Sequence, residues 1–471
     1  MPLRLVVFSA LIAGVASLDA ASGAEPPARP NVVLVIVDDL RPELGCYGCD
    51  HIHSPNIDRL AARGMRFDRA YVQMTFCNPS RTSFLTGMRP NRTRVYSNDV
   101  YYRQVLPDIE TLPQLFRRAG YFTAGCGKIF HGHDSADDAA TWDLTAGIRT
   151  TPEGRCKIKR NLTDGRIRWC WWGMAEGDDE DQPDGQIARF GTEFLAHRPK
   201  DKPFFLALGF HKPHDPFVAP KKYFDLYPLE AIRVHRDPDD MSPTLDAALG
   251  GWKREFAKFT DREKREFLRA YYACTSFTDA QWGKVAAELD RQDLWKNTIV
   301  VFIADHGYHL GERGWWNKNT LFEYSARTPL LVWKPGMKAA GQACTSIVEF
   351  VDIFPTLQEL CRLPETDHDL DGRSFAALLD DPTLPGKEAA FSQNPHPGYS
   401  VRTDRWRLVL WNDGAAGIEL YDHRTDPGEW HNLADDPQYR PLIETLAAPL
   451  HVMYDKGPRR PLPAKTKPPA K

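Results

Sequence analysis

The sequence carries little net charge and has few long apolar stretches. Its 60 basic residues nearly balance its 63 acidic ones, so no overall field favours nucleic acid or an anionic membrane. No run is long and apolar enough for a comfortable membrane span, and we expect no stable membrane anchor. Cysteine is sparse, with nine residues in 471. Cys46 and Cys49 have no second pair at zinc-finger spacing, which favours two structural thiols over a zinc site.

The N-terminus has the pattern of a secretory signal. Arg4 precedes an apolar run at residues 5–15, and small residues follow up to Ala24. We expect cleavage near Ala24, with Ala20 and Ala21 as alternatives. The mature protein is then exported, to the periplasm or medium of a bacterium, or to the lysosome or medium of a eukaryotic cell.

Apolar runs rich in β-branched residues alternate with helical patterns in the mature chain. Such runs suit strands buried on both faces of a sheet, so an α/β fold is predicted. The expected strands are 31–37, 121–126, 203–210, 298–303 and 329–333, and the expected helices are 54–64, 112–119, 185–197 and 261–292. Residues 141–183 are expected to be irregular apart from a strand-like segment with Trp169, Trp171 and Trp172, which either lines a pocket or packs. A disulfide between Cys156 and Cys170 is expected across a hairpin.

Polar clusters follow four of these strands. They are Asp38-Asp39, Lys128 with His131, residues 211–216, and Asp305-His306. Adjacent carboxylates repel, and neither suits a core without a cation, so Asp38-Asp39 after a buried strand favours a metal site over a surface turn. In residues 211–216 two prolines are expected to hold the backbone extended and to orient the two histidines.

A short helix is predicted directly after Cys77. Asn78 is a helix-capping residue, Pro79 suits the first turn, and Gly87 is placed to end the helix. Cys77 then lies at the positive helix end, beside unpaired backbone N–H groups that can receive an anion. A buried cysteine before an ordinary helix is the alternative.

The surrounding residues favour the functional interpretation. The pattern Cys-x-Pro-Ser-Arg-x-x-x-Leu-Thr-Gly at residues 77–87 resembles the full signature of type I sulfatases. In that family the cysteine is converted to formylglycine, whose hydrate is the nucleophile. The resemblance implies a large, mixed, mostly parallel β-sheet sandwiched by helices, as in alkaline phosphatase, and a smaller C-terminal α+β subdomain with an antiparallel sheet.

The resemblance extends to a metal site and to one branch of the family. Asp38, Asp39, Asp305 and His306, with residue 77, match the ligands of one divalent cation, usually Ca²⁺. The histidine in the last place is similar to the iduronate-2-sulfatase branch. The segments 39–48, 127–131 and 210–217 are similar to that branch as well, and the motifs between 419 and 433 resemble the C-terminal pattern of the family.

The resemblance assigns six catalytic residues. Cys77 supplies the nucleophile and Arg81 stabilises it, while Lys128 and Lys318 neutralise the sulfate. His211 is the general acid for the leaving alcohol, and His131 assists regeneration of the aldehyde. The secondary contacts considered are His133 and His214, with a structural role as the alternative.

Taken together, these features predict a sulfatase acting on a uronate 2-O-sulfate in a glycosaminoglycan-like saccharide, matured by a formylglycine-generating enzyme. A phosphoester or phosphonate hydrolase of the same superfamily and a non-enzymatic carbohydrate-binding relative are the alternatives. The expected organisation is a signal peptide at 1–24, a catalytic domain at 25–375, a C-terminal subdomain at 376–457 and a disordered tail rich in Pro and Lys at 458–471.

Overall fold

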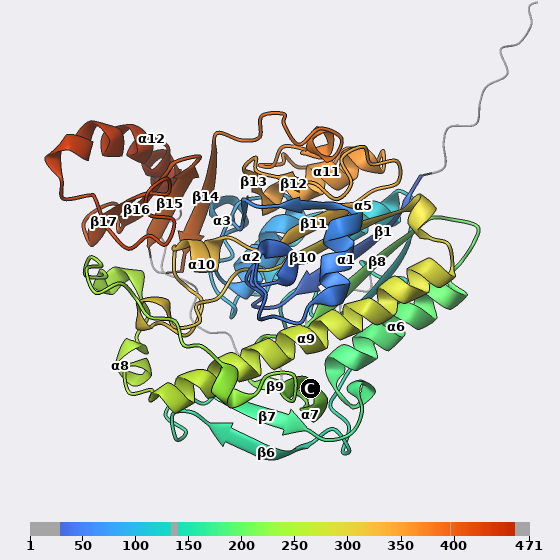
Figure 1. The fold of residues 1–471 in the computed structure, drawn as a ribbon. Coiled ribbons are helices and arrows are strands. Elements are labelled where there is room, and N and C mark those ends of the chain that lie inside the picture. The colour runs from blue at the N-terminus through green and yellow to red at the C-terminus, as the bar shows by residue number, and fades with distance from the viewer. Residues whose placement is uncertain (1–28, 133–139, 396, 457–471) are drawn as a thin grey trace, which may run out of the picture.

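The computed structural model describes residues 29–132, 140–395 and 397–456. The expected signal peptide, the C-terminal tail and His133 lie outside the described residues. Two sheets dominate the described chain: a large mixed sheet and a separate antiparallel sheet near the C-terminus (Figure 1). This is the fold class that the sequence predicts.

The large sheet has eight strands in the order β12-β2-β11-β10-β1-β8-β4-β5. Its central strands β10, β1, β8 and β4 are parallel to one another, whereas β11 is antiparallel to β10 and to β2. The bounds are β1 Asn31–Val37, β2 Met65–Phe67, β4 Phe122–Gly127, β5 Leu144–Ala146, β8 Phe204–Phe210, β10 Thr298–Ala304, β11 Leu330–Trp333 and β12 Ala343–Cys344. The carboxyl ends of the four central strands therefore meet at one edge.

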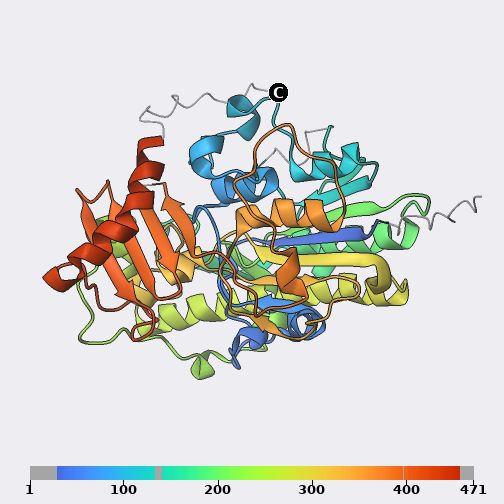
Figure 2. The same cartoon turned by 90° about the horizontal axis from the view of Figure 1, so that it is seen from above.

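Strand β1 contributes to a hydrophobic core on each face of the sheet. Val33, Val35 and Val37 pack with residues of α1, α6 and α9, and the alternate residues of β1 pack with α2, α5 and α11 on the opposite face. Because successive side chains of a strand point to opposite faces, a continuous apolar run fits only a strand covered on both sides. Figures 1 and 2 show the long helix α9 running along one face of the sheet.

The helices follow the predicted segments closely. Their bounds are α1 Pro55–Arg63, α2 Cys77–Thr86, α3 Pro90–Thr93, α4 Tyr102–Val105, α5 Leu112–Arg118, α6 Pro183–His197, α7 Lys221–Phe224, α8 Lys253–Phe256, α9 Asp261–Arg291, α10 Glu323–Ala326, α11 Ile353–Leu360 and α12 Arg440–Lys456. Among the described residues, no helix combines the length and the apolar character that crossing a bilayer requires.

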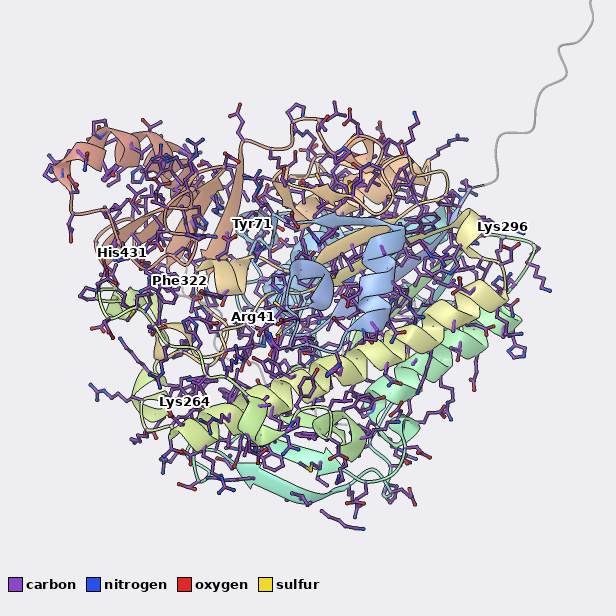
Figure 3. The ribbon with its side chains drawn as sticks, in the orientation of Figure 1. Arg41, Tyr71, Lys264, Lys296, Phe322 and His431 are labelled. Carbon is purple, nitrogen blue, oxygen red and sulfur yellow. The ribbon has the colours of Figure 1, made fainter. Side chains whose placement is uncertain are left out.

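The antiparallel sheet lies at one end of the molecule, with α12 packed against it (Figure 2). Its four strands are β14 Ala389–Asn394, β15 Gly398–Thr403, β16 Trp406–Trp411 and β17 Gly417–Asp422. Tyr71 of β3 (Ala70–Tyr71) and Phe322, both labelled in Figure 3, lie where this sheet meets the rest of the chain. The hydroxyl group of Tyr71 bonds to Glu323, and the ring of Phe322 packs 6.1 Å from that of Tyr421.

The expectation that residues 141–183 are mostly irregular is wrong, whereas the hairpin and the strand-like segment near 169–172 are confirmed. Besides β5, the segment contains β6 (Cys156–Asn161) and β7 (Trp171–Ala175), which form a three-stranded sheet with β9 (Phe217–Pro220). The remaining small pair joins β13 (Val348–Glu349) to β3. Strand β6 carries charged, exposed residues, so it lacks the apolar alternation that would identify it.

The predicted disulfide between Cys156 and Cys170 is also wrong, since both cysteines are free. Cys156 pairs across the hairpin with Ala175, whereas Cys170 lies at the other end of the hairpin, where its carbonyl group accepts the N–H of Leu162. Five or more residues at about 3.3 Å each separate the two positions, far beyond the reach of a disulfide.

Candidate active site

The four central strands of the large sheet deliver the predicted polar residues to one place. Asp38 directly follows strand β1, Asp305 follows β10, His211 follows β8 and Lys128 follows β4. Neighbouring parallel strands place their carboxyl ends along one edge, so groups that are more than 200 residues apart in the chain become neighbours.

Helix α2 brings the fifth element of the site. It begins at Cys77 itself, with Phe76 as the residue before the helix, and it ends at Gly87, whose φ of 68° suits glycine. Asn78 is therefore not the cap that the sequence predicts; its amide group donates instead to the carbonyl oxygens of Ser97 and Val100. All ten residues of α2 are buried.

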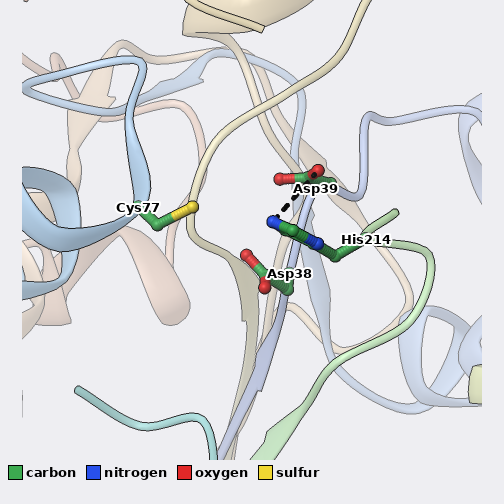
Figure 4. A group of neighbouring side chains, drawn as sticks. All are labelled: Asp38, Asp39, Cys77 and His214. Carbon is green, nitrogen blue, oxygen red and sulfur yellow. Dashed lines mark ion pairs between the residues drawn. The ribbon is translucent and has the colours of Figure 1, made fainter. Parts of the chain in front are cut away.

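Two adjacent aspartates face the same centre because the backbone turns between them. Asp39 has a φ of 63°, which departs from the strand conformation that would send neighbouring side chains to opposite faces. Its N–H donates to Asp305 Oδ1 at 3.1 Å, and its carbonyl oxygen accepts the hydroxyl group of Tyr271 at 2.8 Å. Figure 4 shows Asp38, Asp39, Cys77 and His214 converging.

His306 completes the acidic cluster. Its Nε2 lies 3.3 Å from Cys77 Sγ, 3.4 Å from Asp39 Oδ1 and 3.6 Å from Asp305 Oδ1. Its Nδ1 lies 3.0 Å from the carbonyl oxygen of Gly307, a contact that requires the proton on Nδ1 and leaves the lone pair of Nε2 directed at the cluster. Burial alone would lower the pKa of His306, but the Asp305 carboxylate outweighs it and raises the pKa.

Three cations surround these carboxylates. Lys318 Nζ lies 2.6 Å from Asp39 Oδ1 and 3.1 Å from Cys77 Sγ, Lys128 Nζ donates to Asp38, and Arg81 Nε donates to Asp305 Oδ2 at 2.9 Å. Burial alone would raise the pKa of the Cys77 thiol, but Lys128 and Lys318 outweigh it and hold the pKa well below its usual value. Residue 77 thus lies where a negative charge is stabilised.

The cluster fits a divalent cation. Asp38 Oδ1 and Asp39 Oδ2 are buried without a hydrogen-bond donor among the described residues, although a buried carboxylate oxygen normally has one. Asp38, Cys77, Asp305 and His306 each offer a ligand atom within 4.8 Å of the others. Burial raises the pKa of Asp305 to about 7 against the effect of Arg81, and a cation would favour its ionised form. The three carboxylates are the ligands that a hard divalent cation prefers, whereas the imidazole is a ligand more typical of transition metals.

Two histidines lie beside the cluster in a more open setting. Lys128, His131 and His211 line a cavity of about 370 Å³, and His131 Nδ1 is buried there without a hydrogen-bond partner among the described residues.

The loop after β8 turns instead of extending: the N–H of His214 donates to the carbonyl oxygen of His211 at 2.9 Å, and both X-Pro bonds are cis. The extended backbone expected for this loop is therefore wrong, because this hydrogen bond closes a turn over residues 211–214.

In this turn, each histidine of the loop lies close to a carboxylate group. His214 Nε2 lies 3.9 Å from Asp39 Oδ2, and although burial would lower the pKa of His214, Asp39 raises it to about 9. His211 Nδ1 lies 3.3 Å from Asp184 Oδ1, a buried carboxylate at the start of α6. Asp184 is a residue that sequence reasoning missed. Its place beside Pro183 in the first helical turn is the available signal, but the predicted helix began at Gly185.

The structure therefore brings together Asp38, Asp39, Cys77, Arg81, Asp305, His306 and Lys318, and places Lys128, His131 and His211 at the mouth of the group. Their individual roles stay predictions. The arrangement can hold a tetrahedral oxyanion between a buried nucleophile position, two lysines and a histidine beside a carboxylate.

Comparisons with known proteins agree with this arrangement. The sulfatase family profile matches residues 30–362, and the profile described as N-sulphoglucosamine sulphohydrolase, C-terminal, matches residues 311–456. The chain is 32% identical to the iduronate 2-sulfatase of Mus musculus, over 94% of this chain and 98% of that protein.

Two solved structures share the fold. One is a protein in complex with its substrate D-glucosamine-2-N,6-O-disulfate, with a TM-score of 0.74, 21% identity and coverage of 91% of this chain and 98% of that chain. The other is the phosphonate monoester hydrolase of Agrobacterium radiobacter, with a TM-score of 0.73, 20% identity and coverage of 91% and 96%. The fold is thus that of the sulfatases and alkaline phosphatase.

The fold and the site define a hydrolase of ester-linked oxyanions, and the chain belongs to the sulfatase family. Within that family it is a type I sulfatase similar to the iduronate 2-sulfatases.

Proposed function

We propose that this sulfatase removes the 2-O-sulfate of a uronate in a glycosaminoglycan-like saccharide after export, with formylglycine at position 77 and one Ca²⁺ per chain. The observation that carries the proposal is the setting of residue 77. Its Sγ lies 3.1 Å from Lys318 Nζ and 3.3 Å from His306 Nε2, at the first residue of a buried helix. The similarity to iduronate 2-sulfatases over 94% of the chain supports a sulfated uronate as the substrate.

The lysines and the start of α2 bind the sulfate group. A sulfate ester carries one negative charge. Two lysines can neutralise it: Lys128 is paired with Asp38, and Lys318 is paired with Asp39. Backbone N–H groups in the first turn of α2 add partial positive charge at the same place. Their burial strengthens these interactions, because little water screens them.

Two groups that the protein acquires complete the site. Formylglycine supplies an oxygen nucleophile at position 77 through its hydrated aldehyde, and Ca²⁺ supplies additional positive charge for the sulfate oxygens. Asp38, Asp39, Asp305 and His306 would hold the cation, with residue 77 as the fifth ligand. Arg81 is fixed by Asp305 and by the carbonyl oxygens of Lys128 and Ile129, so its charge faces residue 77.

The histidines move the protons. His211 holds a proton for the oxygen of the leaving alcohol, because a sugar hydroxyl is a poor leaving group as an alkoxide. Asp184 accepts from the backbone N–H of His211 and lies beside its Nδ1, which directs Nε2 away from Asp184. His131, in the cavity beside Lys128, removes the proton that must leave residue 77 before the next cycle.

Maturation and export complete the proposal. A formylglycine-generating enzyme or its equivalent is the partner that modifies Cys77, and the segment at residues 1–24 directs export. The likeness of the fold to a phosphonate monoester hydrolase makes a phosphoester or phosphonate the competing substrate.

The test measures sulfate release from defined disaccharides, after mass spectrometry of the peptide Ala70–Arg81 has established the aldehyde. One disaccharide carries sulfate on the uronate 2-position and another on the hexosamine, with a phosphate monoester as the third substrate. Release from the 2-sulfated uronate alone is the expected result. Turnover of the hexosamine sulfate alone would overturn the uronate assignment, and turnover of the phosphate ester alone would overturn the sulfate assignment.

Two variants test whether the activity depends on this site. Cys77→Ala is expected to fold and to release no sulfate, because it offers no group to oxidise. Cys46→Ala, which changes a half-buried thiol outside the site, is the matched control and should retain activity.

A further inference from the structure

A second cavity adjoins the candidate active site. Its volume is about 540 Å³, and it lies between the β6–β7–β9 sheet and the loop of residues 211–216. His211 and His214 form the side that faces the catalytic cluster, and Arg155, Lys159 and Trp171 form the side contributed by the sheet and its approach. A ligand held at the catalytic cluster can therefore extend directly into this space.

The sheet is built so that one of its faces stays open to this cavity. The other face packs on α9: Arg160 Nη1 lies 2.8 Å from Glu266 Oε1, Trp172 Nε1 donates to Glu266 Oε2 at 3.1 Å, and the ring of Phe217 packs 4.8 Å from that of Phe267. Because side chains alternate along a strand, Lys159 and Trp171 lie on the face opposite Arg160 and Trp172.

Gly173 leaves space in the cavity between the side chains of Lys159 and Trp171. Gly173 pairs with Lys159 on β6 and with Val218 on β9. A Cβ atom at this position would lie 2.7 Å from the sulfur of Cys156 and 3.1 Å from the ring of Trp171. Glycine therefore avoids a clash and leaves room beside the indole ring.

The two exposed cations of the cavity, Lys159 and Arg155, have no acidic partner of their own in the described chain, although Asp184 and Asp215 also line the cavity. Lys159 and Arg155 are exposed, and across the described parts of the chain neither forms an ion pair with a carboxylate. Their neighbours on the same strand differ: Lys157 lies 3.7 Å from Glu176, and Arg160 is paired with Glu263 and Glu266. An aromatic ring with two free cations is a suitable lining for an anionic sugar, since the ring covers an apolar sugar face and the cations bind its carboxylate or sulfate.

We propose that this cavity is the subsite for a second anionic sugar ring, next to the ring whose sulfate is removed. The proposal rests on the proposed function, because it takes the catalytic cluster as the site of the first ring. Trp171 stacks on the second ring, and Lys159 and Arg155 bind its carboxylate or sulfate. The enzyme then selects saccharides with charges on consecutive rings over single sulfated sugars.

The test is a binding measurement that needs no turnover. The dissociation constants of two probes are measured by titration calorimetry on the Cys77→Ala protein with and without Lys159→Ala. One probe is a disaccharide of 2-O-sulfated uronate and N-sulfated glucosamine, and the other is the methyl glycoside of the 2-O-sulfated uronate alone. Lys159→Ala is expected to weaken binding of the disaccharide about tenfold, as for loss of one charge-assisted contact, and to leave the monosaccharide unaffected.

Further variants separate the subsite from a general charge effect. Lys157→Ala removes an equal charge from the same strand outside the cavity and should change neither constant, whereas Trp171→Ala should weaken the disaccharide only. Equal affinity of the parent and Lys159→Ala proteins for the disaccharide would overturn the subsite. Disaccharide binding that depends on Lys159, in a wild-type protein that releases no sulfate, would uphold the subsite and reject the proposed reaction.

Discussion

The carboxylate of Asp184 binds the backbone of His211 and lies beside its imidazole ring. Asp184 Oδ1 accepts the backbone N–H of His211 at 2.9 Å and lies 3.3 Å from Nδ1 of the same histidine, while Oδ2 accepts the N–H of Lys212 at 2.8 Å. The side chain of Asp184 is buried, so it fixes the start of the loop after β8 and places a negative charge beside the imidazole ring.

Replacing Asp184 by Asn should therefore weaken proton donation by His211. We expect kcat for a sugar sulfate to fall about 10- to 100-fold, which is part of the effect of a general acid, because an amide stabilises the protonated imidazole less than a carboxylate does. An aryl sulfate, whose phenolate leaves without a proton, should lose far less. An equal loss for both substrates would show that Asp184 acts on the fold and not on His211.

Removal of divalent cations should destabilise the protein. Asp38, Asp39 and Asp305 are buried close together, and a bound cation offsets their mutual repulsion. Ca²⁺ at 100 times its dissociation constant should raise the free energy of unfolding by about 2.7 kcal/mol, seen as a higher thermal midpoint than in excess chelator. Asp305→Asn should respond less to Ca²⁺. Equal midpoints of the wild-type protein with Ca²⁺ and with chelator would contradict a site at this cluster.

The antiparallel sheet is joined to the catalytic part of the chain through Arg407. Its guanidinium group bonds to Glu429 and to Glu323 of α10, and Nη1 donates to Ser400 at 3.0 Å. Burial alone would raise the pKa of Glu429, but Arg407 and His423 together outweigh it and lower the pKa to about 2. Arg407→Met should cost about 3–5 kcal/mol, because it removes the guanidinium group that Glu323 and Glu429 share and leaves their charges compensated only by weaker partners such as Tyr71 and His423.

Urea denaturation measures this loss. The control is Arg405→Met, which removes a more exposed arginine that pairs with Asp422 and should cost no more than about 1 kcal/mol. Similar midpoints for the two variants would mean that the buried network does not stabilise the union of the two sheets.

Asp279 should make stability depend on pH. Its Oδ1 accepts the N–H groups of Asn56 and Ile57 at the start of α1, yet burial outweighs these bonds and raises its pKa to about 7. The folded state thus binds a proton more tightly than the unfolded chain does. This contribution is complete below about pH 4 and is lost as the pH rises through 7, by at most about 1.4 kcal/mol per pH unit.

Asp279→Asn removes this contribution while keeping an oxygen for the two N–H groups. Relative to the wild-type protein, the variant should be more stable at pH 8 than at pH 5, as urea midpoints at the two pH values will show. Asp290→Asn, at an exposed position of the same helix that pairs with Arg63, should leave the pH dependence unchanged. A slope equal to that of the wild-type protein in Asp279→Asn would contradict the assignment.

The sequence was informative where physical patterns are local. Apolar runs such as residues 31–37 and 298–303 identify strands buried on both faces, and the polar residues that follow them mark the edge of the sheet where the site forms. Those two features together predicted an α/β fold with a polar site at that edge, whereas the mixed sheet, the C-terminal subdomain and the residues grouped around Cys77 were implied by the family resemblance. The signature at residues 77–87 then gave the family.

Contacts that depend on tertiary structure could not be predicted in this way. Asp184 reaches His211 across 27 positions of the chain, and nothing local to either residue requires it. Strand β6 exposes Lys157, Ile158 and Lys159 in succession, so its place in a sheet depends on pairing with β7 and not on its own pattern. The union of the two sheets through Arg407 and Glu323 is likewise a property of the folded chain.

Because α2 is completely buried, any enzymatic oxidation of Cys77 has to precede folding of the chain. Cys77 has no exposed surface once the chain has folded, and every other residue of its helix is buried as well. A thiol in this position cannot enter the active site of another protein, so an enzyme that oxidises it must act on the nascent or unfolded chain. Rapid folding would then preserve an inactive protein, and the yield of active enzyme in any host would reflect a competition between two rates.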